Sequence, residues 1–386
     1  MRLKLDNIAL LLIIVASISR LLIPQINTVM LFGVIPALYI WRTCNDTIMF
    51  GNRSVLVYTL LLFWNFVATV FADNPNQALD SLTSAILGAY LLSIIFYSIS
   101  RKSQSHACWI MIAYWFILAS SLFYLSSIGL IDSIDITTDR LNDDKVNAND
   151  LAYYTFYVIC TIPLLFGIKN GNRKKPFLMY VLLVFMIYQT VQLALLTASR
   201  QFLLLVLPFA IFTLVFCASK GKLSKIAIGS IVILVVFCAF AESYVLDKLD
   251  GSYLMARMET NIKDDSRTPL LIRAIEVGAD NLLLGVGPGN FVNYTDGHFS
   301  HNSYTELFAC TGIIGMFLFI YIVALFISKQ WEYYKKSKEP LFLYLFIFGV
   351  LWAGYNFLYA FYLSVWLMPF LYCIWGYSER MFATLK

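Results

Sequence analysis

The sequence predicts an all-α, polytopic integral membrane protein of about twelve transmembrane helices, a fold class that follows from its composition and from the lengths of its apolar runs. Of the 386 residues, 60% are hydrophobic and only 13% are charged. This balance lies far outside the range of soluble globular domains. The apolar residues also gather in runs whose lengths suit the roughly 30 Å hydrocarbon core of a bilayer.

The apolar spans follow one another along the chain. The second span is short, and the last two form one continuous apolar run that we divide near Gly354, Tyr355 and Asn356. The first span has no small-residue cleavage site and contains Arg20, which indicates a retained helix rather than a removed signal peptide. The predicted spans are 8–24, 28–41, 55–72, 79–99, 107–130, 151–168, 177–197, 201–218, 226–241, 301–327, 341–355 and 358–376. We expect them to form a single transmembrane domain over residues 1–386.

Basic residues alternate between the two sides of the predicted membrane. Of the 28 Lys and Arg residues, 19 lie at the termini and in the even-numbered connections, which are short. Positive charge in short loops marks the cytoplasmic side, so both termini are expected in the cytoplasm and two long polar loops face outward. Because this alternation accounts for the net charge of +5, no nucleic-acid partner is predicted.

The first outward loop, Asp132 to Asp150, holds six aspartates. A solvated surface turn is the favoured interpretation, and a lid or an acceptor-binding rim is the alternative. The aspartates lack the spacing of a calcium loop, and the seven cysteines are scattered without paired ligand spacing. We therefore predict no metal site and no cofactor.

The second outward loop, residues 242–300 between the ninth and tenth helices, is the place where a small extramembrane subdomain is expected. Thr268-Pro269 begins a helical apolar pattern that continues to about Asn281, which predicts an amphipathic helix at the outer interface. Arg273 and Glu276 are three residues apart on it, and this spacing favours a structural ion pair. Arg267, just before the helix, is the better candidate for binding an anion.

Two further features close this loop. The segment Gly285 to Asn290 reads GVGPGN, but no Lys-Ser/Thr follows it, so a tight turn is favoured over a nucleotide loop. His298 and His301 flank the point where the chain returns to the membrane. A single interfacial histidine is usually structural, and two at this spacing suggest a metal pair, but no carboxylate or Cys beside them completes one.

Two outward arginines lie elsewhere. Arg20 is near the outer end of the first helix, where snorkelling to the headgroups is the default interpretation. Arg200 lies in a very short outer turn, Thr197 to Gln201, which fixes its position. Arg200 and Arg267 could together form a two-arginine clamp.

Several of these motifs, in their order and spacing, resemble the O-antigen ligase and O-antigen polymerase superfamily over roughly Thr197 to Ile327. Relatives often have a Glu just before the glycines that correspond to Gly312 and Gly315, whereas this chain has Cys310-Thr311 there and Glu306 one helical turn earlier. Position 310 would face away from His301, so a glutamate at that position in relatives is expected to pack or orient rather than catalyse. The motifs are Ser199-Arg200, Arg267, Gly285 to Phe291, His301 to Tyr304, and Gly312 to Gly315.

The resemblance implies a glycosyltransferase of the bacterial inner membrane that acts on the periplasmic face, with loop 242–300 as a periplasmic subdomain that carries part of the active site. The implied donor is a glycan on undecaprenyl or another polyprenyl pyrophosphate, the acceptor is a second glycan, and a chain-length regulator is a further partner. A guanidinium fork suits a departing pyrophosphate, and a histidine suits a hydroxyl that must be deprotonated. The assigned roles are general base for His301 and pyrophosphate binding for Arg200, Arg267 and Arg273, with His298, Arg20, Tyr304 and Asn302 as secondary candidates.

Three functions stay open at this point. An O-antigen polymerase is favoured, because no feature of the chain can be tied to a core oligosaccharide. An O-antigen ligase, which transfers the polyprenyl-linked glycan to lipid A-core, is the alternative. A transporter of lipid-linked glycans is less favoured, because the two halves differ in loop plan and the spans hold few ionisable residues.

Overall fold

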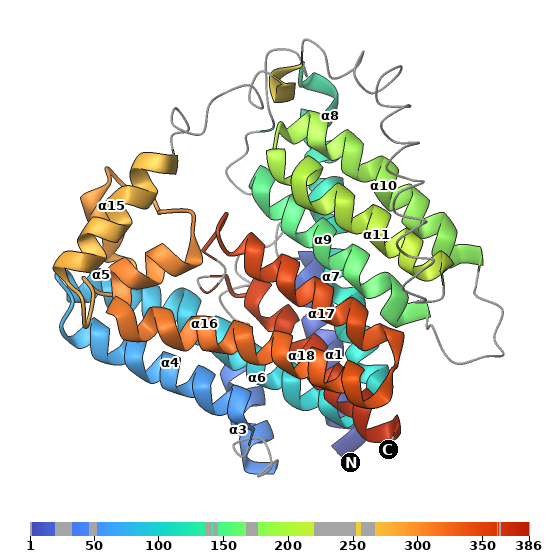
Figure 1. Ribbon diagram of the computed structural model, residues 1–386, viewed down its shortest axis with the longest axis horizontal. Helices are drawn as coiled ribbons and strands as arrows, with labels where there is room; N and C mark the ends of the chain where they lie inside the picture. The colour runs from blue at the N-terminus through green and yellow to red at the C-terminus, as the bar shows by residue number, and fades with distance from the viewer. Residues whose placement is uncertain are drawn as a thin grey trace. The chain divides into compact units, whose positions relative to one another are not determined.

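The computed structural model describes the chain as a set of helices (Figure 1). The described residues are 2–19, 33–45, 52–135, 141, 146–166, 177–219, 252–255, 267–360, 362 and 364–385. Within them there is no strand, in agreement with the predicted all-α class. The helices are α1 (Arg2–Ser19), α3 (Ile35–Asn45), α4 (Arg53–Val70), α5 (Pro75–Ser81), α6 (Leu87–Lys102), α7 (Gln104–Ser127), α8 (Leu130–Ser133), α9 (Ala148–Phe166), α10 (Phe177–Thr197), α11 (Leu207–Ala218), α15 (Arg267–Asp280), α16 (Ser303–Ser337), α17 (Pro340–Tyr355) and α18 (Leu367–Leu385).

Five of the described helices are long and apolar enough to cross a membrane. Two shorter apolar helices, Phe202–Ala218 and Pro340–Tyr355, accompany them. The chain is therefore a multi-pass membrane protein. The predicted span 226–241 lies outside the described residues. The five helices are Arg53–Val70, Pro75–Lys102, Gln104–Ser127, Phe177–Thr197 and Ser303–Ser337.

The chain folds as two compact units. Residues 1–9, 25–107 and 262–386 form the first unit, and residues 10–24 and 108–261 form the second. In the first unit, α16 runs beside α4, α17 and α15, and α18 packs on α6 (Figure 1). In the second unit, α10 packs on α9 and α11. Asparagine side chains cap the starts of α4 and α5 in the first unit: Asn52 accepts from Ser54 N (2.8 Å) at α4, and Asn74 accepts from Gln77 N (3.3 Å) at α5.

The C-terminal helices differ in extent from the predicted spans. The break predicted near residues 354–356 is confirmed, because α17 ends at Tyr355. The last helix begins at Leu367, however, and the predicted start at residue 358 is wrong. Carbonyl oxygens of this connection serve another helix: Asn356 O accepts from Ser303 N and Tyr359 O from Ser303 Oγ, both at 2.7 Å. Backbone groups used to hold the start of α16 are not available for a helical ladder.

A break divides α16 at Gly312. Its backbone is far from helical (φ 67°, ψ −170°), so the carbonyl groups of the preceding turn lose their intrahelical partners. Each of the three finds a substitute. Ala309 O accepts from Val286 N (2.9 Å), Cys310 O from Gly287 N (2.9 Å) and Thr311 O from Trp64 Nε1 (2.8 Å).

The segment that supplies two of these donors is the GVGPGN turn. Gly285, Gly287 and Gly289 all have positive φ, which agrees with the predicted tight turn. The absence of a side chain also lets this segment contact the broken helix, because a Cβ on Gly285 would lie 2.3 Å from the carbonyl carbon of Cys310. On the other side of the break, Ile313 N donates to Leu282 O (2.8 Å).

We predict that Gly285→Ala destabilises the protein much more than Gly297→Ala. Both glycines have positive φ, but a Cβ on Gly297 meets nothing within 4 Å, so that variant isolates the conformational cost of about 1 kcal/mol. Gly285→Ala adds a clash with backbone and should cost about 3 kcal/mol or more. Thermal melting of the two detergent-purified variants checks this. Equal melting temperatures would show that the close contact does not hold the break.

Candidate functional site

His301 lies between the glycine turn and α16 in a left-handed backbone conformation that is uncommon outside glycine. Its φ is 55°, and an L side chain in this left-handed region costs roughly 1–2 kcal/mol. Its neighbours Ser300 and Asn302 are both 2% exposed, whereas His301 itself is partly exposed. A buried residue on each side therefore presents the imidazole at the surface of the first unit.

Each flanking residue is fixed by a hydrogen bond to α16. Ser300 N donates to Glu306 Oε2 (2.7 Å), and the Asn302 side chain caps the helix by accepting from Tyr304 N (2.9 Å) and Thr305 N (3.3 Å). Ser300 Oγ also donates to Asn302 O (3.1 Å). These contacts impose the left-handed conformation on His301.

Glu306 is fully buried, four residues into a helix long enough to cross a membrane. Besides Ser300 N, its carboxylate accepts the Cys310 thiol across one helical turn (Sγ to Oε1, 3.9 Å). The sequence alone does not assign Glu306 a role. The signal that could have identified it is an ionisable residue inside an apolar span, because burying such a residue in a membrane costs free energy and usually marks a functional position.

The secondary candidates Asn302 and Tyr304 take part in this framework. The Asn302 amide oxygen serves as the helix cap described above. Tyr304 OH donates to Ala353 O in α17 (2.9 Å), and its ring packs against Phe319 and Phe357, with centroids 5.9 and 4.7 Å away. Both side chains thus tie the His301 segment to the helices.

The predicted arginines of the long loop lie on α15. This amphipathic helix was predicted from Thr268 and begins at Arg267, so Arg267 belongs to its first turn and is partly buried. Arg273 pairs with Glu276 (Nη1 to Oε2, 3.0 Å), the structural role favoured by their spacing. The pair is about half exposed, and the Arg273 guanidinium lies 5.8 Å from the Tyr294 ring centroid.

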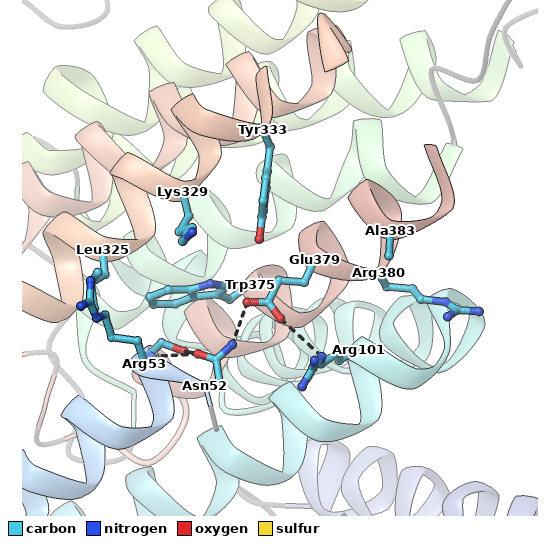
Figure 2. Close-up of a pocket in the computed structure, with 11 residues that line it drawn as sticks. Asn52, Arg53, Arg101, Leu325, Lys329, Tyr333, Trp375, Glu379, Arg380 and Ala383 are labelled. Carbon is cyan, nitrogen blue, oxygen red and sulfur yellow. Dashed lines mark hydrogen bonds and ion pairs between the residues drawn. The ribbon is translucent and has the colours of Figure 1, made fainter. Parts of the chain in front are cut away.

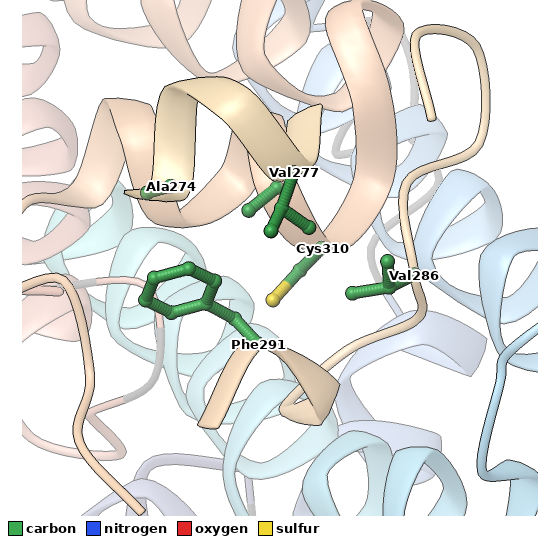
Figure 3. Packing of buried hydrophobic residues seen from close by; sticks show 6 residues of the cluster. Ala274, Val277, Val286, Phe291 and Cys310 are labelled. Carbon is green, nitrogen blue, oxygen red and sulfur yellow. The ribbon is translucent and has the colours of Figure 1, made fainter. Parts of the chain in front are cut away.

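An apolar cluster holds α15 to the site. Figure 3 shows Ala274 and Val277 of α15 facing Phe291, Val286 and Cys310, all of them buried. A hydrogen bond also holds the loop after the glycine turn to the segment that follows α4, because Tyr294 OH donates to Asp73. This hydrogen bond, together with desolvation, raises the pKa of the exposed Tyr294 hydroxyl. The α15 helix, the glycine turn and the start of α16 therefore form one packed assembly.

Arg200 belongs to the second unit, whereas Arg267 and His301 belong to the first. It follows a turn in which Ala198 has a left-handed conformation (φ 47°) and Ser199 Oγ donates to Asn149 Oδ1 (3.1 Å). The turn is short, as predicted, and Arg200 is partly buried. The two-arginine clamp stays a prediction.

The remaining candidates are two. His298 is exposed on the turn before His301, where its carbonyl accepts from Thr295 Oγ1 (2.5 Å). Arg20 lies outside the described residues. Among the described side chains, no group of three or more His, Cys, Asp or Glu could hold a metal ion.

Residues 178–320 match the O-antigen ligase family model. Over these residues the chain is similar to that family. The match contains Arg200, Arg267 and His301, and it confirms the resemblance to the O-antigen ligase and polymerase superfamily. This family indicates a membrane glycosyltransferase that acts on lipid-linked glycans. A comparison with curated proteins found no match.

We predict that the Glu306 carboxylate holds the His301 segment of the O-antigen ligase domain in place. Glu306→Gln keeps an acceptor oxygen for Ser300 N, whereas Glu306→Leu leaves that N–H buried without a partner, at a cost of about 1–3 kcal/mol. Hydrogen exchange read by mass spectrometry should therefore speed up for residues 298–303 in Glu306→Leu only. Unchanged exchange there would contradict the role, and peptides from residues 326–333 of α16 serve as the internal control.

Proposed function

We propose that the chain is an O-antigen polymerase that transfers a growing surface glycan from polyprenyl pyrophosphate to a lipid-linked repeat unit on the periplasmic face of the inner membrane. The observation that carries this proposal is the strained, partly exposed His301, clamped by Glu306 and Asn302 within the family domain. Strained backbone persists where the surrounding structure over-determines it and is concentrated at functional sites.

In the proposed reaction His301 is the general base. One imidazole nitrogen takes the proton of the acceptor hydroxyl, and the oxygen attacks the anomeric carbon of the donor sugar. The bond from that carbon to the pyrophosphate oxygen breaks, and the pyrophosphate leaves with the electron pair. Removal of such a base typically costs 10²- to 10⁴-fold in rate.

The arginines are proposed to stabilise the leaving group. Negative charge grows on the pyrophosphate as the glycosidic bond breaks, and a guanidinium offers paired donors and a permanent positive charge. Arg267 in the first turn of α15 and Arg200 after the Ala198 turn are the proposed ligands. Arg273 is a third, because an exposed ion pair of the kind it makes with Glu276 is worth at most about 1 kcal/mol and opens readily.

We predict that His301→Ala and Arg267→Ala abolish glycan polymerisation while His298→Ala preserves it. The host lacks its own copy of the gene and expresses each variant at matched membrane levels, and its glycans are resolved by gel. His298 is the matched control because it is exposed and three residues away. Normal ladders from the His301 and Arg267 variants would remove the proposed site and favour a transporter.

The species that accumulates without the protein separates the two transferases. Single repeat units on the polyprenyl carrier identify a polymerase. Long glycans stranded on the carrier identify a ligase, whose acceptor is lipid A-core.

We further predict that Arg267→Lys fails to restore wild-type ladders. Lysine keeps the charge but presents it as a point rather than as a planar fork. We expect the Arg267→Lys variant to polymerise glycan about tenfold more slowly than wild type or worse. The change in glycan length and amount at matched expression measures this loss. Full activity of this variant would mean that charge alone suffices at position 267.

A further inference from the structure

A second polar site lies in the first unit, at the other end of the helices that hold His301. It is a pocket of about 550 Å³ between the start of α4 and the ends of α6 and α18, beside the later part of α16 (Figure 2). The α4 helix begins at this pocket with Arg53 and ends at Val70, next to the segment that contacts the glycine turn. Its 18 residues rise about 27 Å, so the pocket is separate from the candidate active site.

The pocket is strongly cationic. Arg53, Arg101, Lys329 and Arg380 line it, against the single carboxylate of Glu379. Glu379 is already occupied, because it accepts from Asn52 Nδ2 (3.0 Å) and Tyr97 OH (2.6 Å) and lies 3.5 Å from Arg101 Nε. The excess of positive charge therefore stays available to a ligand.

Within the described part of the chain, two of the pocket's cations have no acidic partner. Lys329 pairs with Glu332 (2.8 Å), and Arg101 pairs with Glu379. Among the described residues, no carboxylate lies within ion-pair distance of Arg53 or Arg380. Their guanidinium groups are exposed at the rim, where they can bind an anion without breaking an internal contact.

Trp375 also lines the pocket. It is 2% exposed, and within the described part of the chain its indole N–H has no hydrogen-bond acceptor. A buried polar group without a partner is unfavourable, and a small shift of the indole toward a ligand oxygen would satisfy it. The first turn of α4 adds backbone N–H groups and the positive end of its dipole.

We propose that this pocket binds the phosphate of an anionic phospholipid headgroup. The apolar side chain of Leu325 and the ring of Trp375 line the same cavity, which suits an amphipathic ligand better than a free anion. The site also lies at the ends of three helices that are long enough to cross a membrane, where Lys and Arg meet headgroups.

Native mass spectrometry of the detergent-purified full chain tests this proposal. The protein is titrated with phosphatidylglycerol and, separately, with phosphatidylcholine and inorganic phosphate. The double variant Arg53→Gln, Arg380→Gln should retain phosphatidylglycerol about tenfold less well than wild type. Lys335→Gln, Lys338→Gln is the matched control, since it also removes two positive charges, here from the end of α16, at residues that do not line the pocket.

The outcomes divide clearly. Selective retention of phosphatidylglycerol by wild type and the control, lost in the arginine variant, supports the proposal. Equal retention by all three proteins, or equal retention of phosphatidylcholine, overturns it. Phosphate that protects wild type from heat while phosphatidylglycerol does not bind would identify a soluble ligand and overturn the lipid assignment. Equal melting of the two double variants ensures that the comparison concerns folded protein.

Discussion

A helix inside a bilayer cannot leave backbone carbonyls without donors, and the break at Gly312 creates three of them. The fold meets this demand with two backbone N–H groups of the glycine turn and the Trp64 indole. That requirement ties the long loop to α16 and, through Trp64, to α4. The packing of α15 and the placement of His301 both depend on this junction.

The segment around His301 illustrates how a rigid framework fixes the position of one side chain. Its neighbours are buried and hydrogen-bonded, so the segment has few other conformations to adopt, and only the imidazole is left at the surface. Such preorganisation means that little reorganisation is needed when a substrate arrives. Here the buried Glu306 carboxylate contributes to it by accepting from the backbone N–H of Ser300.

Much of this architecture is readable from sequence, because local signals decide it. The helix over α15 follows from Thr268-Pro269 and an apolar stripe, and the turn over residues 285–290 follows from its glycines. The break at Gly312 and the late start of α18 are not readable in this way. Both depend on partners distant in the chain, Leu282 and Val286 for the first and Ser303 for the second. The role of Glu306 escaped for the same reason, since its acceptor function appears only when Ser300 folds back upon it.

The break also divides α16 into two pieces, residues 303–311 and residues 313–337. Residues 303–311 hold the His301 segment through the Asn302 cap and contact α17 through Tyr304 and α4 through Trp64, whereas residues 313–337 form the remainder of the helix. A change in the length of α16 after Gly312 therefore need not displace His301. The length of residues 313–337 can then change to suit a thicker or thinner bilayer while residues 300–306 keep their depth, which separates adaptation to the host membrane from the geometry of the candidate site.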